Sequence, residues 1–341
     1  MGRPTIRDLA QAAGVSVATV NRVLGGSTPV RDATMEQVLS AARSIGFYGV
    51  GALEQRIHAP RQKHRLGVIV QTPHHGFSSR LERCFEEAAA DSEHDVRLRI
   101  AHLDDLSPES VAQQMQSLAA ESDALAVLAA EHPIVSDTID LLATAGLPTI
   151  ALVSPLAARA TVGYVGLDSW KAGRTAAWAF DHLCKTPGKL GLLVGTHRYR
   201  NHDMNESGFR SYFREHASGF TLLEPLSTFE SDAIAREQTE KLLREHPDLQ
   251  GLHIAGGGIG GVLAALRASG QAGRLITVGY DLTESSKTGL LDGSLTMMIS
   301  QPLDRLARET IAATLRARQA PAGAGSQSVL IPFDLHTREN I

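Results

Sequence analysis

Apolar positions recur at helical spacing in three separate stretches of the first 46 residues. The first stretch follows Thr5, which forms a capping-box pattern with Asp8, and Gly14 ends it. Ser16 is placed to begin the second stretch, and the third runs from 32 to 44. The apolar positions are Ile6, Leu9, Ala10 and Ala13; Val17, Val20, Val23 and Leu24; and Met35, Val38, Leu39 and Ala42. Three short helices with a four-residue turn between the first two are typical of a helix-turn-helix, whose second helix enters the major groove of DNA. A generic three-helix bundle is the alternative.

From Leu66 the pattern changes to short, continuous apolar runs separated by helical stretches. The runs predict buried strands at 66–70, 96–102, 124–128 and 149–153, and then at 163–165, 190–194, 221–226, 252–255 and 275–279. Strands that alternate with helices form parallel sheets covered by helices on both faces. Two such series predict an α/β body of two doubly wound lobes that follows an all-α head.

The formal net charge of −4 conceals a difference between the two parts. Residues 1–65 contain nine Lys or Arg and four Asp or Glu, whereas the remainder contains 24 and 33, so the nets are +5 and −9. A basic head on an acidic body indicates a polyanionic partner for the head alone. The alternative is a local variation in charge without functional meaning. The two cysteines, Cys84 and Cys184, exclude a disulfide scaffold and a cysteine-rich zinc module, and they fit a reducing cytosol.

No secretion signal or membrane segment is expected. Arg7 and Asp8 stand where a signal peptide needs an apolar run. The uncharged stretch 141–158 contains Pro148 and Pro155, which favour a turn and a buried strand over a membrane span. The sequence therefore predicts a cytoplasmic protein without a membrane partner.

The head carries the run TIRDLAQAAGVSVATVNRVL at 5–24. This run resembles, almost residue by residue, the signature of the lactose-repressor (LacI/GalR) family of bacterial transcription regulators, and the resemblance continues through the chain. It implies a regulator, most often a repressor, whose affinity for double-stranded operator DNA is controlled by a small sugar-like effector. We expect a homodimer because two half-sites need two heads. No cofactor is expected, and a pure solute-binding module would not explain the head.

The resemblance also implies the domain organisation. It gives a helix-turn-helix head at 1–46, a hinge at 47–62 and an effector-binding body of the periplasmic-binding-protein type at 63–341. The first lobe is expected at about 65–163 plus 295–325, and the second at about 164–292 plus 326–341. The ligand is expected between the lobes, beyond the carboxyl ends of the parallel strands. No heptad extension follows the last strand, so we expect no tetramerising helix.

The resemblance places Val17, Ala18 and Arg22 on the groove-facing side of the second helix. An arginine can donate two bonds to guanine, and small apolar side chains contact the methyl group of thymine. A plain phosphate contact is the alternative for Arg22. Phosphate contacts orient a protein on DNA without specifying sequence, and the positions suited to them are Thr5, Ser16, Thr19 and Asn21.

The hinge departs from the family pattern. In the family this segment forms a short helix on DNA, and a leucine wedges into the minor groove and kinks the duplex. Here Gly49-Val50 replaces the usual Pro-Asn, and Arg56 stands at the wedge position between the apolar candidates Leu53 and Ile57. An arginine can enter a narrow minor groove, so these three residues are predicted to contact DNA. Whether they also kink the duplex is left open by the sequence.

The ligand positions of the family match this sequence only in part. Asp281 matches a sugar-contacting aspartate, Gln301 a cleft glutamine, and Asp168 a position where a helix opens at the cleft. A carboxylate accepts two bonds from neighbouring hydroxyls, although a helix cap is the alternative for Asp281. No catalytic residue is predicted.

Three departures argue against a known hexose specificity. Asn205 and Gly256 stand where the family often has an arginine and an asparagine, and Val153-Ser154 replaces a usual carboxylate. Arg198 lies in a polar loop, 197–203, that we expect to reach the cleft. These residues lead us to expect a polyol, a sugar acid or a sugar phosphate.

The segment Gly256–Gly261 fits the G-x-G-x-x-G dinucleotide fingerprint, and Asp281 lies twenty residues beyond it. The alternative function is therefore a nicotinamide-dependent oxidoreductase. We favour a turn at the effector cleft, whose free N–H groups suit an anionic or strongly polar ligand, or else close helix–strand packing. No metal site is predicted, because the histidines at 74, 75, 197 and 202 lack suitably spaced carboxylate or thiolate partners.

Overall fold

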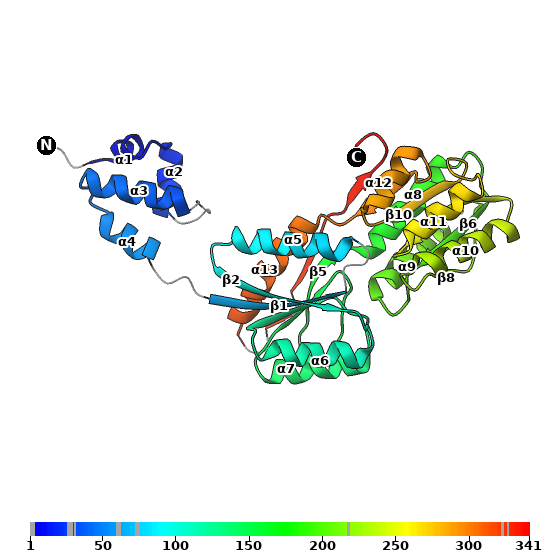
Figure 1. The fold of residues 1–341 in the computed structure, drawn as a ribbon, viewed down its shortest axis with the longest axis horizontal. Coiled ribbons are helices and arrows are strands. Elements are labelled where there is room, and N and C mark those ends of the chain that lie inside the picture. Colours follow the sequence, from blue (N-terminus) through cyan, green and yellow to red (C-terminus); the bar gives the residue numbers. More distant parts are fainter. Residues whose placement is uncertain are drawn as a thin grey trace. The chain divides into compact units, whose positions relative to one another are not determined.

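The computed structural model describes residues 4–25, 30, 32–58, 63–71, 76–216, 219–321, 324–325 and 327–341, without the side chains of 32 and 55–58. The chain divides into two compact units. They consist of residues 1–63 with 91–96, and of residues 64–90 with 97–341. The N-terminal helices are blue in Figure 1, and the chain of the second unit runs from cyan to red.

The head contains four helices: α1 (Ile6–Ala12), α2 (Val17–Gly25), α3 (Asp32–Ser44) and α4 (Val50–His58). The expected capping box is present, because the Thr5 hydroxyl accepts from the Asp8 N–H while the Asp8 carboxylate accepts from the Thr5 N–H. Gly14 adopts a φ of +63°, which allows the tight turn between α1 and α2. The Gln37 amide holds α3 against this turn by donating to the Ala13 carbonyl at 2.9 Å. The helix-turn-helix prediction is confirmed.

The fourth helix belongs to the same hydrophobic core as the first three. Leu53 is 2% exposed and packs with Phe47 and the apolar faces of α1–α3, and Arg43 pairs with Glu54 at 2.7 Å. A Cβ at Gly49 would lie 3.1 Å from the Phe47 ring, so the chain turns back closely where the family has Pro-Asn. The segment expected to be a separate hinge helix therefore packs onto the head, in the conformation described.

Two largely parallel sheets form the centre of the second unit. The first has the order β12 (Ser328–Ile331), β5 (Gly163–Leu167), β4 (Thr149–Leu152), β3 (Ala124–Val127), β1 (Lys63–Gln71), β2 (Asp95–Leu103). The second has the order β13 (Asp334–His336), β11 (Met297–Ser300), β10 (Ile276–Tyr280), β9 (Leu249–Ala255), β6 (Lys189–Val194), β7 (Thr221–Leu222), and β8 (Leu226–Ser227) also pairs with β6. The final strand, β13, runs antiparallel to β11.

Nine helices of the described chain complete these two lobes. The first lobe has α5 (Phe77–Ala90), α6 (Pro108–Ala119), α7 (Pro133–Thr144) and α13 (Leu303–Gln319); Figure 1 shows α5 and α13 on one face of its sheet and α6 and α7 on the other. The second has α8 (Ser169–Leu183), α9 (Arg200–His216), α10 (Asp232–Glu245), α11 (Ile259–Ala268) and α12 (Glu284–Asp292). No helix among the described residues is long and apolar enough to cross a membrane.

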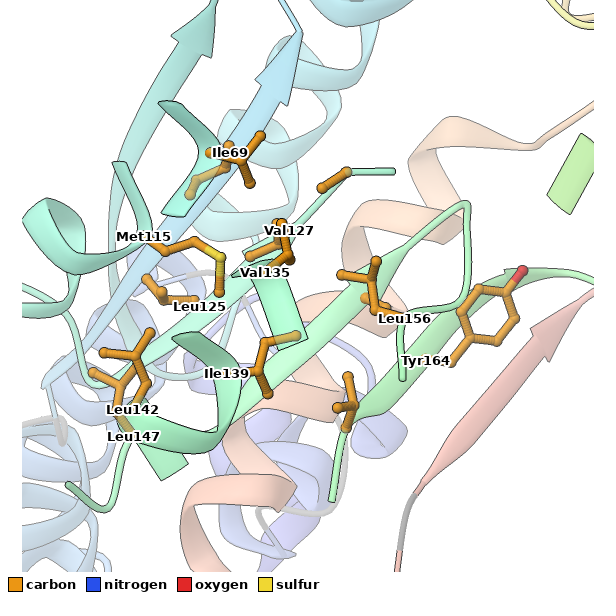
Figure 2. Close-up of a cluster of buried hydrophobic side chains, with 14 of the residues drawn as sticks. Ile69, Met115, Leu125, Val127, Val135, Ile139, Leu142, Leu147, Leu156 and Tyr164 are labelled. Atoms are coloured by element: carbon orange, nitrogen blue, oxygen red, sulfur yellow. The ribbon is translucent and has the colours of Figure 1, made fainter. Parts of the chain in front are cut away.

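The α/β prediction for the body is confirmed by these layers. Figure 2 shows how the first lobe closes one of its faces: Met115 of α6 and Ile139 of α7 point toward Ile69, Leu125 and Val127 of the sheet. All five side chains are at most 1% exposed. Burial of each aliphatic side chain of this size stabilises the folded state by roughly 1.5–3 kcal/mol. This layer therefore holds the strands in place, and with them the strand ends at which a ligand can bind.

The strand pairing shifts the expected lobe boundaries. β5 and β12 pair with each other in the first sheet, and β11 pairs with β10 in the second. The predicted bounds gave β5, β12 and β11 to the opposite lobe. The chain crosses between lobes at 167–169, 300–303 and 331–334. All residues of β5 and β11 are buried, so their apolar runs fit either sheet and do not reveal their partners.

Candidate functional site

The exposed side of α2 carries most of the residues predicted to contact DNA. Val20 and Val23 are buried in the head core, whereas Ser16, Val17, Ala18, Asn21 and Arg22 are exposed and Thr19 is half-buried. The Ser16 hydroxyl accepts from the Thr19 N–H at 3.1 Å and so caps the helix. The helix thus presents a polar face with two exposed apolar side chains, those of Val17 and Ala18, which matches the chemistry of a major groove.

Arg22 lies along its own helix in this structure. Its Nε donates to the Ala18 carbonyl and its Nη2 to the Thr19 hydroxyl, both at 3.4 Å. These bonds are long and exposed, so they oppose a move of the guanidinium toward a base only weakly. Thr5 makes a shorter bond than Arg22 does, because its hydroxyl donates to the Asp8 carboxylate at 2.8 Å. The hydrogen bonds from Thr5 hold the pKa of Asp8 below its usual range.

The three predicted hinge contacts have separate outcomes. Leu53 lies in the head core, so its side chain is not presented to a minor groove in this conformation. Arg56 and Ile57 belong to α4, and their side chains lie outside the described residues. Sequence alone did not indicate the burial of Leu53, because the burial depends on the backward turn at 47–50.

A cavity of about 310 Å³ lies between the two lobes. Its wall in the first lobe is formed by residues at the ends of strands and the start of α5: Gln71, Gly76, Phe77, Ser78, Leu128 and Val153. Its wall in the second lobe includes Tyr199, Asn201, His202, Glu230, Asp232, Gly256–Gly260, Tyr280, Asp281, Thr283, Glu284 and Ser285. This position beyond the strand ends is where open α/β sheets bind ligands.

The glycine-rich turn between β9 and α11 packs closely against the connection from β8 to α10. A Cβ at Gly261 would lie 1.8 Å from the Asp232 carbonyl, and one at Gly257 would lie 2.2 Å from a Glu230 carboxylate oxygen. That oxygen, Oε2, accepts from the Gly257 N–H at 2.8 Å. The expectation that this turn offers free N–H groups to an anion is therefore wrong at Gly257, where the protein's own carboxylate takes the bond. The same carboxylate would repel the phosphates of a dinucleotide.

Strained backbone gathers at the cavity. Among the described residues, four non-glycine residues have positive φ: Val153, Phe229, Glu230 and Asp281, with values between +51° and +69°. Three of them line the cavity, and Phe229 lines a neighbouring cavity. The β-branched Val153 is the least suited to this conformation. Such strain costs roughly 1–3 kcal/mol per residue and concentrates at functional sites.

Asp281 lies at the end of β10 and is half-buried, with part of its surface on the cavity. Burial raises the pKa of its carboxyl to about 7, and the negative charge of Glu230 adds to this, while the Gln301 amide and Arg80 oppose it. The alternative role of helix cap is not observed, because Thr283 caps α12. Gln301 is 5% exposed, and its amide lies close enough to the Asp281 carboxyl to lower that group's pKa.

Two other predicted ligand residues lie away from the cavity wall. Asp168 caps α8 by accepting from the Lys171 N–H at 3.0 Å. Asn205 is 2% exposed and accepts from His253 at 2.8 Å, inside the second lobe. Burial lowers the pKa of His253 to about 4, so the imidazole is a neutral donor there. The structure does not support direct ligand contact for either residue.

The polar segment at 197–203 divides between the two cavities. Arg198 lines a second cavity of about 330 Å³, with His132 and Phe229, and not the first. From Arg200 onward the segment forms the start of α9, which was expected to be loop, and brings Asn201 and His202 into the first cavity. His197 pairs with Glu206 at 2.8 Å. His74 and His75 lie outside the described residues, within which no three His, Cys, Asp or Glu are grouped to hold a metal ion.

Sequence reasoning missed three important residues of the cavity wall. Glu230 and Tyr199 line both cavities, and Gln71 of the first lobe donates to the Tyr199 hydroxyl of the second. Burial raises the pKa of Tyr199 to about 12, so its hydroxyl stays protonated. Two signals were available: Gln71 follows a predicted strand, and Tyr199 lies within the segment 197–203 that was expected to reach the cleft. Glu230 lies in a connection without periodicity.

Two family descriptions match this architecture. The model of bacterial regulatory proteins of the lacI family matches residues 5–49, and that of the periplasmic binding protein domain matches 66–320. A helix-turn-helix head followed by a two-lobed body with a cleft cavity defines a ligand-controlled transcription regulator. The chain belongs to the lacI family of bacterial regulatory proteins, with a body of the periplasmic binding protein type.

Individual relatives are of the same two kinds, a transcription regulator and solute-binding proteins. The HTH-type transcriptional regulator GntR of Pseudomonas aeruginosa is 23% identical over 271 residues, which cover 78% of this chain and 76% of that protein. The D-ribose/D-allose-binding protein of the same species is 27% identical over 179 residues, so the match spans 52% of this chain and little more than half, 56%, of that relative. A solute-binding protein of Actinobacillus succinogenes with bound D-allose has a TM-score of 0.72 at 19% identity, covering 81% of this chain and 98% of its own, which shows the fold alone.

Proposed function

We propose that this chain is a cytoplasmic repressor whose α2 binds operator DNA and whose cleft cavity binds a small hydroxyl-rich ligand without an anionic group. The observation that carries the ligand class is the composition of the cavity wall. It contains four carboxylate residues and no Lys or Arg within the part of the chain described. Carboxylates accept two hydrogen bonds at once, which suits neighbouring hydroxyl groups.

The remaining wall suits a sugar or polyol. Phe77 and Tyr199 supply aromatic surface for an apolar face, and Gln71 and Asn201 supply amides for a polar edge. A few polar groups placed within a mainly apolar pocket are the usual means of fixing a small ligand. The volume of about 310 Å³ is near the lower end of such pockets, roughly 300–1,000 Å³, and favours a ligand of one ring.

The charge distribution argues against the sugar acids and sugar phosphates that the sequence had also led us to expect. Arg198 lies at the second cavity, and Arg200 faces Glu131 at 3.8 Å. The N-terminus of α11, one of the helix starts on the cavity wall, is approached by Glu230 and Asp232. An anionic ligand would meet these two carboxylates there. The sugar-binding relatives, named for D-ribose and D-allose, are consistent with an uncharged ligand framework.

We further propose that the ligand acts on DNA affinity by stabilising contact between the lobes. Gln71 bonds to Tyr199 across the cleft, and Arg80 of α5 donates to the Leu282 carbonyl in the second lobe. A ligand that binds both walls favours the arrangement in which these contacts form. In a homodimer on two half-sites, such a shift typically changes operator affinity by about 1–3 kcal/mol.

Selection from a random duplex pool, followed by calorimetry, tests both halves of this proposal. The full chain should enrich a two-fold symmetric site, and its affinity should fall steeply with salt because phosphates are neutralised. Calorimetry with a panel of pentoses, hexoses and cyclitols should find a binder, while the matching sugar acids and phosphates should not bind. Tight binding of a sugar phosphate with no binding of any uncharged compound would contradict the ligand class.

A further inference from the structure

Glu230 and Asp281 place two carboxyl groups on one side of the cavity, whose described wall contains no Lys or Arg. Both line the cavity, and the charge of Glu230 is one of the influences on Asp281. Asp232 and Glu284 add two further acids to the described wall, whose only basic side chain is His202. Burial lowers the pKa of His202, so this imidazole is neutral at physiological pH.

Two buried acceptors at this place have no donor among the described residues. One Glu230 oxygen is satisfied by Gly257, but the other, Oε1, is buried without a hydrogen-bond partner among the described residues, and His202 Nδ1 lies 3.8 Å from it. Asn201 is 5% exposed, lines the cavity, and has its amide oxygen unpartnered. Unsatisfied buried acceptors are rare in native proteins, because their desolvation is costly. These two acceptors therefore need donors that the described residues do not supply.

A ligand ammonium group supplies both missing elements. It carries a positive charge and three N–H donors but no acceptor. A hydroxyl donates one bond only, and it brings no positive charge to the two carboxyl groups. A positive group is favoured most where opposite charges lie in a site largely excluded from water.

We propose that the ligand is an amino sugar or aminated polyol whose ammonium group binds between Glu230 and Asp281, with Asn201 accepting one of its hydrogen bonds. This inference rests on the proposed hydroxyl-rich ligand and adds the amine. It also gives Glu230 a second role in specificity. By taking the Gly257 N–H, its carboxylate removes a donor that an anionic ligand would otherwise use.

Calorimetry of the full chain with matched compounds tests the amine directly. The probes are D-glucosamine, D-galactosamine, D-mannosamine and 1-amino-1-deoxy-D-glucitol, each compared with its hydroxyl parent and its N-acetyl derivative. We expect at least one amine to bind ten-fold or more tightly than its parent, and N-acetylation to remove this preference because it removes the charge.

Two variants connect the preference to the carboxylates. Glu230→Gln keeps the shape and an oxygen for Gly257, and should reduce the amine-over-parent ratio ten-fold or more. Asp281→Asn should do the same, and a melting curve establishes that each variant is folded. Glu240→Gln removes the same charge at the exposed pair with Arg236 on α10 and should leave the ratio unchanged.

The outcomes separate this inference from the proposed function. Hydroxyl parents that bind as tightly as their amines, or more tightly, overturn the ammonium site and leave the hydroxyl-rich ligand standing. A preference for amines that survives in both Glu230→Gln and Asp281→Asn overturns the assignment to these carboxylates. Failure of every amine and every parent to bind overturns the inference and the proposed ligand class together.

Discussion

The carboxylate of Glu230 accepts a hydrogen bond from the backbone N–H of Gly257 at 2.8 Å. This bond joins the connection between β8 and α10 to the turn between β9 and α11, and both connections line the ligand cavity. It also explains why the turn is rich in glycine, since a Cβ at Gly257 would lie 2.2 Å from the accepting oxygen. In the sequence these glycines resemble a dinucleotide-binding motif. In the structure they allow the turn to pack closely against the carboxylate of Glu230.

We therefore expect Gly257→Ala to destabilise the body and weaken ligand binding. The added methyl must displace Glu230, and loss of this charged hydrogen bond costs about 1.5–3 kcal/mol. Urea unfolding followed by circular dichroism measures the change. Gly325→Ala is the matched control, because a Cβ at Gly325 meets nothing within 4 Å. Equal stability of the two variants would contradict the role of the bond.

The stability of the body should depend on pH through Asp281. Its pKa in the folded protein is raised to about 7 from 3.8, so the proton favours the folded state. This contribution is complete below about pH 4 and is lost as pH rises through 7. As the pH rises from 5 to 6.5, the free energy of unfolding of wild type should fall by about 1.4 kcal/mol per pH unit relative to that of Asp281→Asn. If the free energies of unfolding of the two proteins change with pH in the same way, the pKa of Asp281 is not raised by folding, and the prediction is wrong.

Arg22→Ala should weaken operator binding by about 1–3 kcal/mol and relax the sequence preference at one base pair. The reason is loss of a bidentate contact to guanine from the exposed face of α2. Fluorescence anisotropy with operators changed at single positions measures both effects. Arg244→Ala removes the same charge from α10 in the body and serves as the control. An equal loss on every sequence would reveal a phosphate contact instead.

Leu53→Ala should destabilise the head by about 2–5 kcal/mol, because Leu53 is 2% exposed in its core. Limited proteolysis of the full chain should then cut within the head faster than in wild type. Tyr48→Ala, at a neighbouring side chain that is 74% exposed, should leave the head intact. If Leu53→Ala instead keeps the head stable and abolishes DNA bending in a gel assay, α4 must leave the head and Leu53 must act as a wedge.

Local chemistry made much of the fold predictable from the sequence. The capping box at Thr5, the turn at Gly14 and the buried stripe of α2 depend on residues a few positions apart, so their spacing determines them. Asp281 was found because it matches a sugar-contacting aspartate of the family that the sequence resembles, and it follows a predicted strand. Such features are encoded within single elements or at their ends.

Contacts between distant segments were not predictable in this way. Glu230 meets Gly257 across 27 positions, and nothing in the periodicity of either connection indicates the pairing. The fully buried strands β5 and β11 carry no pattern that distinguishes one sheet from the other. Leu53 has the spacing of a hinge residue, and its burial follows from the turn after Phe47.

In the proposed mechanism, a ligand in the cleft cavity controls the affinity of the head for DNA. The most direct measurement is anisotropy of the full chain on its selected operator, with and without the tightest compound found by calorimetry. We expect that compound to change operator affinity about 5–150-fold, and Asp281→Asn to bind the operator without this response. An operator affinity that is identical with and without saturating ligand would contradict the claim.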